Sequence, residues 1–218
     1  MKKQVLGMEL KAMSAQETVE KLTELLEADS LSVCALIRSG MLLEAEKNEE
    51  YRELLNRLTF TMIGDTDILK ALGEESEVYQ REIENQTVLS EWLDWLAREE
   101  KSIVVLTENE KLKNSAMEFI RSAYPDLRLA EVIAMEEMEA EDDVVNHING
   151  MDVDVVLAEL SIPEQEEFIF KNKAKLNIGM WIGMGKNVSS RRKSDSMPGF
   201  FEKLIEKRIF KKKVTSYF

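Results

Sequence analysis

The sequence predicts an α/β domain of Rossmann-like, three-layer architecture with a mostly parallel sheet. Short apolar runs alternate with amphipathic stretches of roughly 10 to 15 residues, a pattern typical of βαβ units. The chain has 218 residues, of which 44% are hydrophobic and 33% charged, enough for one large domain with a buried core. Three prolines and nine glycines argue against a long disordered linker. We expect the Rossmann-like domain at residues 1–188 and a basic appendage at residues 189–218.

The first half of the chain opens with a helix. Ser14 stands three residues before Glu17, the spacing of a capping box, and Leu22 and Leu26 follow on one helical face. Continuous apolar runs then predict buried strands. We expect strands at 31–37 and 58–63, a helix at 41–58 with a break near Asn48, and a helix at 87–99 whose Trp92 and Trp95 pack in the core.

The second half alternates more regularly. Tyr124, Pro125 and Asp126 end one helix, Gly150 is a favoured cap for another, and Pro163 suits the start of a third. We expect strands at 102–106, 127–134, 152–158 and 178–182, helices at 109–123, 139–149 and 163–175, and a basic amphipathic helix at 200–213.

Charge is distributed unevenly along the chain. The net charge of −13 argues against nucleic acid as the main partner. From Lys186 onwards ten Lys/Arg face three acids, so this tail carries +7 and the remainder −20. A basic tail on an acidic body suggests contact with an anionic surface, such as phospholipid or a diphosphate. The same lysines are also consistent with the solvated face of a helix that packs through Phe200, Leu204 and Ile209.

The cellular compartment and the role of the cysteine are predicted from the segments and residues that the sequence contains or lacks. It has no apolar window of roughly 18 to 20 residues and no N-terminal signal peptide, so we expect a cytoplasmic protein whose basic tail makes any peripheral membrane contact. Cys34, the one cysteine, lies in an apolar run and is interpreted as a core residue. His147, the one histidine, lies in a polar stretch, so we expect no Cys/His dyad, metal or cofactor. The oligomeric state stays open.

The candidate site comprises the loops beyond the carboxyl ends of the strands, where parallel sheets bind ligands. These loops span residues 38–40, 64–67, 107–110, 160–163 and 183–187, and none contains a Gly-rich phosphate loop or a GxGxxG motif. Gly179, Gly183 and Gly185 lie in and after an apolar run, where close backbone packing competes with phosphate binding as the explanation.

Carboxylates follow two of the strands. Asp65 and Asp67 precede a helix, where they could supply a general base or hold a metal, although an Asp helix cap explains the same pattern. The stretch from Ser161 to Phe168 also opens a helix, whose N-terminus suits a phosphate. Three acids in its first turn oppose that use because they complement the helix dipole themselves.

Several stretches resemble the WecG/TagA/CpsF family of glycosyltransferases, in the family's order. The most specific is Pro163-Glu-Gln-Glu-Glu-Phe-Ile-Phe-Lys-Asn-Lys173, which is similar to the signature PKQE-x-W-I-x-x-N-x. The others are an opening strand and helix at residues 5–17, the segment 48–56, and the segment 119–129, which is similar to LxxxYPxLxI. The likeness runs from about residue 5 to residue 188 and implies the family's fold.

The resemblance also implies an activity. Family members transfer an N-acetylhexosamine-type sugar from a UDP-sugar to a polyprenyl-diphosphate-linked acceptor in cell-envelope polysaccharide synthesis, with inversion and without a metal. Their general base is an Asp in a PDG motif. Here the segment reads Ile63-Gly-Asp-Thr-Asp67, so gapless alignment puts Gly64 at the base position and Asp65 one residue late. A slip of one residue turns a side chain to the opposite face of a strand.

Further family positions are substituted. Larger side chains obstruct close backbone approach to a ligand, and extra acids repel a diphosphate. The substitutions are Arg38 for an Asn, Thr87 for an Asp, Thr107 and Glu108 for two glycines, Ser161 for a glycine and Asn187 for an Asp.

Two hypotheses follow. In the first, the chain is an active transferase with Asp65 as general base, and its partners are a UDP-sugar and a polyprenyl-diphosphate lipid. In the second, it is a degenerate relative that acts as a nucleotide-sugar-binding or protein-interaction module. Under the first hypothesis the substrate-binding residues are Arg38, Asp67, Gln165, Glu166, Gly183, Arg191 and Arg192.

Overall fold

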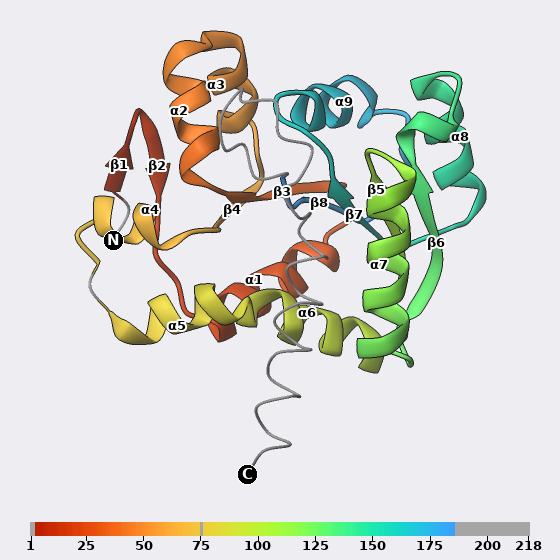
Figure 1. Cartoon of the computed structure of the whole chain (residues 1–218), viewed down its shortest axis with the longest axis horizontal. Helices are drawn as coiled ribbons and strands as arrows, with labels where there is room; N and C mark the ends of the chain where they lie inside the picture. The colour runs from red at the N-terminus through yellow and green to blue at the C-terminus, as the bar shows by residue number, and fades with distance from the viewer. Residues whose placement is uncertain (1–2, 75, 186–218) are drawn as a thin grey trace.

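The computed structural model describes residues 3–74 and 76–185 and confirms the predicted α/β class. Six parallel strands form a sheet in the order β4-β3-β8-β7-β5-β6 (Figure 1). Their bounds are β3 Ser32–Ile37, β4 Phe60–Ile63, β5 Ser102–Thr107, β6 Arg128–Ala134, β7 Val155–Glu159 and β8 Met180–Gly183. The helix expected at 200–213 and the appendage at 189–218 lie outside the described residues.

Helices cover both faces of the sheet, which gives the expected three layers (Figure 1). One core cluster joins the sheet to three helices, α1 (Ala15–Leu26), α6 (Thr87–Arg98) and α7 (Glu110–Ala123). Two clusters on the opposite face join it to α2 (Ser39–Lys47), α3 (Glu49–Asn56), α8 (Glu141–Gly150) and α9 (Glu164–Asn172). The other helical elements of the described residues are α4 (Thr66–Ala71), α5 (Glu77–Asn85) and a 3-10 turn at Met135–Glu137.

Side-chain alternation along the strands assigns residues to these two faces. In β5, Ile103 and Val105 pack towards α1, α6 and α7, whereas Val104 and Leu106 pack towards α8 and α9. Both faces are therefore apolar, which explains why the strands read as continuous hydrophobic runs. Cys34 in β3 is fully buried, and burial raises its pKa to about 12, so the thiol is inert at neutral pH.

Local signals in the sequence shape most helix ends as expected. Ser14 and Glu17 form the capping box of α1, and the Asn48 side chain caps α3, which confirms the break in the 41–58 helix. Trp92 and Trp95 stack with ring centroids 4.9 Å apart against the core. Gly150 differs from the prediction: it is the last residue of α8, and Met151 is the cap.

The N-terminal segment is a hairpin where a single opening strand was expected. β1 (Lys3–Val5) pairs antiparallel with β2 (Met8–Leu10), outside the main sheet. Leu6 and Gly7 between them have φ values of 47° and 84°, the positive sign that a two-residue type I′ turn requires. Met8 and Leu10 are buried against α2 and α3, so the hairpin packs through one face of its second strand.

We predict that burial in the cluster around α6 contributes strongly to stability. Leu93 is 0% exposed, so Leu93→Ala should lower the free energy of unfolding by about 2–5 kcal/mol through lost burial and the cavity left behind. Leu43 on α2 is 50% exposed, and Leu43→Ala should change it by less than about 0.5 kcal/mol. Equilibrium urea denaturation of both variants measures the difference, and similar losses would contradict the assignment of the core.

Candidate functional site

Chain connections diverge at the carboxyl edge of the sheet and place the candidate site there. β3 is followed by α2 and α3 on one face, whereas the chain after β4 returns through α6 on the other. The neighbouring strands β5 and β7 diverge in the same way, towards α7 and α9. Crevices of this kind are where open α/β sheets bind ligands. The predicted loops follow the carboxyl ends of these strands.

Gly64, which the resemblance aligns with the family's general base, has no room for a side chain. Its N–H donates to the Ile37 carbonyl at 2.7 Å, which holds the end of β4 against β3. A Cβ at Gly64 would lie 2.9 Å from that carbonyl oxygen and 2.9 Å from Leu36 Cγ. Because the first obstacle is backbone within a parallel strand pair, any side chain here would displace the sheet edge.

Asp65 caps α4, as the structural interpretation of this motif expected. Its Oδ1 accepts a hydrogen bond from Ile68 N at 3.1 Å, and its Oδ2 accepts one from Ser39 N at 2.6 Å. The carboxylate thus joins the start of α4 to the start of α2. Asp67 is separate from this arrangement, because its side chain is 72% exposed and forms a surface ion pair with Lys70.

Arg38 lies at the end of β3, between two acidic strand ends. Burial lowers the pKa of its guanidinium, and the carboxylates of Asp65 and Glu159 act in the opposite direction. Glu159, the last residue of β7, is fully buried. Sequence analysis missed Glu159, although an acid that ends the apolar run from Val155 was a usable signal. The positive charge of Arg38 is therefore shared with two acids of the protein itself.

Gln165 and Gly183, both predicted to bind substrate, pack against each other. The Gln165 side chain is fully buried, and its Oε1 accepts from Gly185 N at 3.2 Å and Leu160 N at 3.5 Å. A Cβ at Gly183 would lie only 2.3 Å from Gln165 Nε2. Gly183 is thus the gap into which the amide fits, which confirms close packing as the explanation for this glycine.

Glu166 continues this network towards α3. Its carboxylate accepts from Gln165 Nε2 at 2.8 Å and from the Tyr51 hydroxyl at 3.2 Å, and it is only 1% exposed. Burial raises the pKa of Glu166 to about 7, and its two hydrogen bonds only partly oppose that shift. Burial and the nearby Glu166 charge also raise the pKa of Tyr51. Gln165 and Glu166 of the family signature thus join α9 to α3 and to the chain that follows β7 and β8.

Thr107, Glu108 and Ser161, which stand where the resemblance implies glycines, form side-chain hydrogen bonds within the protein. Thr107 Oγ1 donates to the Ile133 carbonyl at 3.0 Å inside the sheet. Ser161 Oγ donates to Glu108 Oε1 at 3.0 Å, which joins the loops after β5 and β7. These side chains are therefore hydrogen-bonded within the protein at positions where the resemblance implies glycines.

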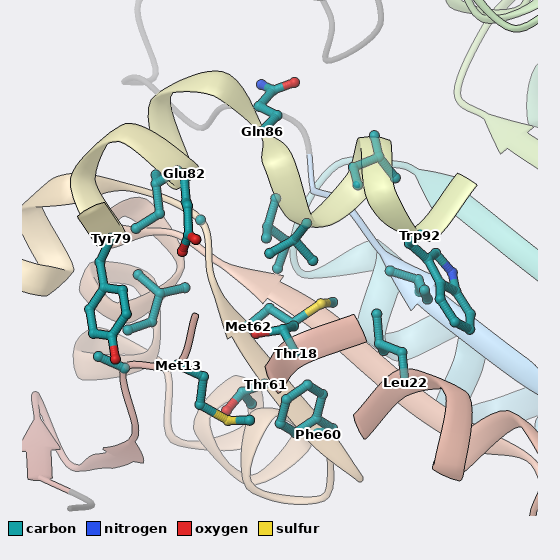
Figure 2. Close-up of a pocket in the computed structure, with 18 of the residues that line it drawn as sticks. Met13, Thr18, Leu22, Phe60, Thr61, Met62, Tyr79, Glu82, Gln86 and Trp92 are labelled. Atoms are coloured by element: carbon teal, nitrogen blue, oxygen red, sulfur yellow. The ribbon is translucent and has the colours of Figure 1, made fainter. Parts of the chain in front are cut away.

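A cavity of about 80 Å³ lies beside this edge, under α5 and the start of α6. Figure 2 shows Tyr79 and Glu82 of α5 on one side and Leu22 and Trp92 on the other, with Met62 between them. Arg38 and Gly64 also line it, so it adjoins the predicted base position. Most of the lining is apolar: Ala12, Met13, Leu22, Leu36, Phe60, Met62, Ile63, Leu69, Ile83, Val88, Leu89, Trp92, Ile182 and Met184.

Some of the sequence predictions can be compared only with the described part of the chain. Arg191 and Arg192 lie outside the described residues, so their roles stay predictions. Within residues 3–74 and 76–185, no three His, Cys, Asp or Glu side chains gather as metal ligands would. In the same part of the chain, none of the helices has the length and apolarity to cross a bilayer. The exposed side chain of His147 forms a pair with Glu131, whereas Cys34 is fully buried.

Fold and site together define the class: an open parallel α/β domain with its candidate site at the carboxyl edge of the sheet. The Glycosyl transferase WecG/TagA/CpsF family matches residues 3–190, and the chain belongs to that family. This confirms the resemblance carried by the 163–173 signature. Comparison with curated proteins finds no match.

We predict that Gly183→Ala destabilises the protein by about 1–3 kcal/mol. The new methyl group would push the Gln165 amide off its buried hydrogen bonds, and buried polar groups left unpaired cost about that much. Gly150→Ala is the matched control, because nothing lies within 4 Å of its added Cβ and Ala favours a helix. Equal urea midpoints for Gly183→Ala and wild type would contradict the close packing of Gln165 against Gly183.

We also predict that Glu166 makes stability depend on pH. Its folded pKa of about 7 lies above the unfolded value near 4.5, so the folded state alone holds the proton between these values. Stability should therefore fall as pH rises from about 4.5 to 7, at up to about 1.4 kcal/mol per pH unit.

The matched variant is Glu166→Gln, which imitates the protonated carboxyl group. It should flatten this part of the stability curve and be more stable relative to wild type at pH 8 than at pH 5. Urea denaturation across this range measures both curves. Parallel curves for the two proteins would show that Glu166 does not titrate in this window.

Proposed function

We propose that this chain keeps the family fold and a ligand-binding crevice but does not transfer a sugar. The packing of Gly64 carries the proposal. A general base must reach the acceptor hydroxyl through a side chain. At Gly64 even a Cβ would lie 2.9 Å from the Ile37 carbonyl oxygen, so the position that supplies the base in the family cannot do so here without moving β3.

Asp65 is a poor replacement in this geometry. Both of its oxygens accept backbone hydrogen bonds, from Ser39 N and Ile68 N. Turning the carboxylate towards a substrate would remove the cap of α4 and release the start of α2, and loss of a cap alone costs about 1 kcal/mol. The structural role of Asp65 therefore competes with a catalytic one.

Charge at the carboxyl edge supports the same proposal. Glu108 and Glu159 bring carboxylates to the ends of β5 and β7, and a UDP-sugar would bring a diphosphate to the same edge. Like charges in a partly buried crevice repel strongly. Arg38 would offset this repulsion only by leaving its interactions with Asp65 and Glu159.

The second candidate is the active transferase of the first hypothesis. One observation favours it: Asp65 follows β4 beside Arg38 and the cavity, one residue from the family's base position. In that case Asp65 deprotonates the acceptor, Arg191 and Arg192 bind the diphosphate, and the basic tail contacts the membrane.

Purified full-length protein tests the two candidates directly. We expect no transfer from UDP-N-acetylglucosamine or UDP-N-acetylmannosamine to a polyprenyl-diphosphate-linked acceptor, in an assay that detects an active family member run in parallel. Calorimetry with the same UDP-sugars reports separately whether the crevice still binds them.

The control variant is Asp65→Asn, whose one amide oxygen can accept from Ile68 N but which loses the bond from Ser39 N. Measurable transfer by wild type would contradict the proposal. If Asp65→Asn then lowered that transfer by about a hundredfold or more, the usual contribution of a general base, the active transferase would stand in its place.

A further inference from the structure

The cavity under α5 has the chemistry of a site for hydrocarbon. Met13, Met62 and Met184 contribute flexible thioethers from three segments of the chain, and Phe60, Leu89 and Trp92 supply broad apolar surface. Methionine-rich linings adapt to the shape of an apolar ligand. Apolar cavities exclude water, and one of about 150 Å³ binds benzene.

The helix over this cavity is held loosely. Every residue of α5 keeps some exposure, and Val78 on its outer side is 60% exposed. A hydrogen bond that Glu82 Oε2 accepts from Ala15 N at 3.0 Å connects α5 to the start of α1. The helix lies between Gly73, with a φ of 64°, and Gln86, with a φ of 55°. Elements with few buried contacts are the ones that open locally.

We infer that this cavity binds the hydrocarbon chain of a lipid, with α5 moving to admit it. The inference rests on the proposed function, since it names the ligand class of a family member that binds without transferring sugar. A static volume of about 80 Å³ takes only a few carbons, so a longer chain requires α5 to shift. A sugar nucleotide suits the cavity less well because most of its polar atoms would meet apolar side chains, although Gln86 Oε1 and Trp92 Nε1 in the lining have no hydrogen-bond partner.

The charged lining groups fit this assignment. Three charged residues line the cavity: Lys11 is exposed, Glu82 accepts a hydrogen bond from Ala15 N, and the Arg38 guanidinium interacts with Asp65 and Glu159. None of the three is both buried in the cavity and left available for an anion. The ligand is therefore recognised by apolar area, which stabilises binding in proportion to the number of methylene groups buried.

The test is a titration of full-length protein, labelled with ¹³C at its methionine methyl groups, with hexan-1-ol, octan-1-ol and geraniol. We expect saturable shifts at Met13, Met62 and Met184, and none at Met8 or Met180, which are buried but do not line the cavity. Octan-1-ol should bind about tenfold more tightly than hexan-1-ol. Tighter binding of octan-1-ol than of geraniol assigns an unbranched chain, and the reverse order assigns an isoprenoid.

Two variants fill the cavity from different segments of the chain, so that the test does not depend on the folding of a single variant. Val88→Phe and Ala12→Leu should each weaken octan-1-ol binding at least tenfold. Val78→Phe, the same exchange on the outer side of α5, should leave it unchanged.

Three results would overturn the inference: no saturable shifts, shifts spread over all methionines, or binding unaffected by both filling variants. The inference and the proposed function fail separately. Sugar transfer would contradict the proposed function whatever the methionine signals show, and absent alcohol binding would leave the transfer result intact.

Discussion

The fit of one buried amide into the space beside one glycine organises the carboxyl edge of this protein. Gln165 comes from α9, but its Oε1 is bonded to the backbone that follows β7 and β8, and its Nε2 is bonded to Glu166. Glu166 extends the connection to Tyr51 on α3. Because the Gln165 side chain fills the position that a Cβ of Gly183 would take, neither partner can change alone. The relative position of two central strand ends and two helices depends on this contact.

The same edge is closed electrostatically as well as sterically. Arg38 interacts with Asp65 and Glu159, and Ser161 bonds to Glu108, so charged groups at four strand ends already interact within the protein. A crevice that binds diphosphate needs cations and backbone N–H groups left available for the ligand. Here Arg38 and Ser161 already interact with acidic side chains of the protein, so a ligand would have to compete with these internal partners. The apolar cavity next to this edge imposes no such competition.

Periodicity and capping chemistry predict most of this fold. Buried parallel strands read as continuous apolar runs, and Ser14, Asn48 and Asp65 each lie at helix starts for the local reason that the sequence suggests. α5 escaped prediction because its nine residues are mostly polar and none of them is fully buried. The hairpin at the N-terminus depends on two positive φ values, one of them at a leucine, which propensity does not favour.

The candidate site was harder to predict, since its features are contacts between distant segments. Gly64 was identified as the departure from the family's base, but its steric closure depends on β3, about 27 residues away in sequence. Glu159 and the Gly183–Gln165 fit likewise join residues that only the sheet order brings together. Strand order is not encoded in the local pattern, so spacing alone could not reveal these pairs.

The uneven survival of family motifs has a physical explanation. The matched signature is the segment whose side chains are built into the structure: Gln165, Glu166 and Asn172 are all buried and hydrogen-bonded, and Asn172 joins α9 to Glu141. Loss of any of them would leave buried polar groups unpaired. Substitutions instead gather in the strand-end loops, where a ligand rather than the core would constrain the residue. The signature residues therefore serve the packing of the fold in this chain.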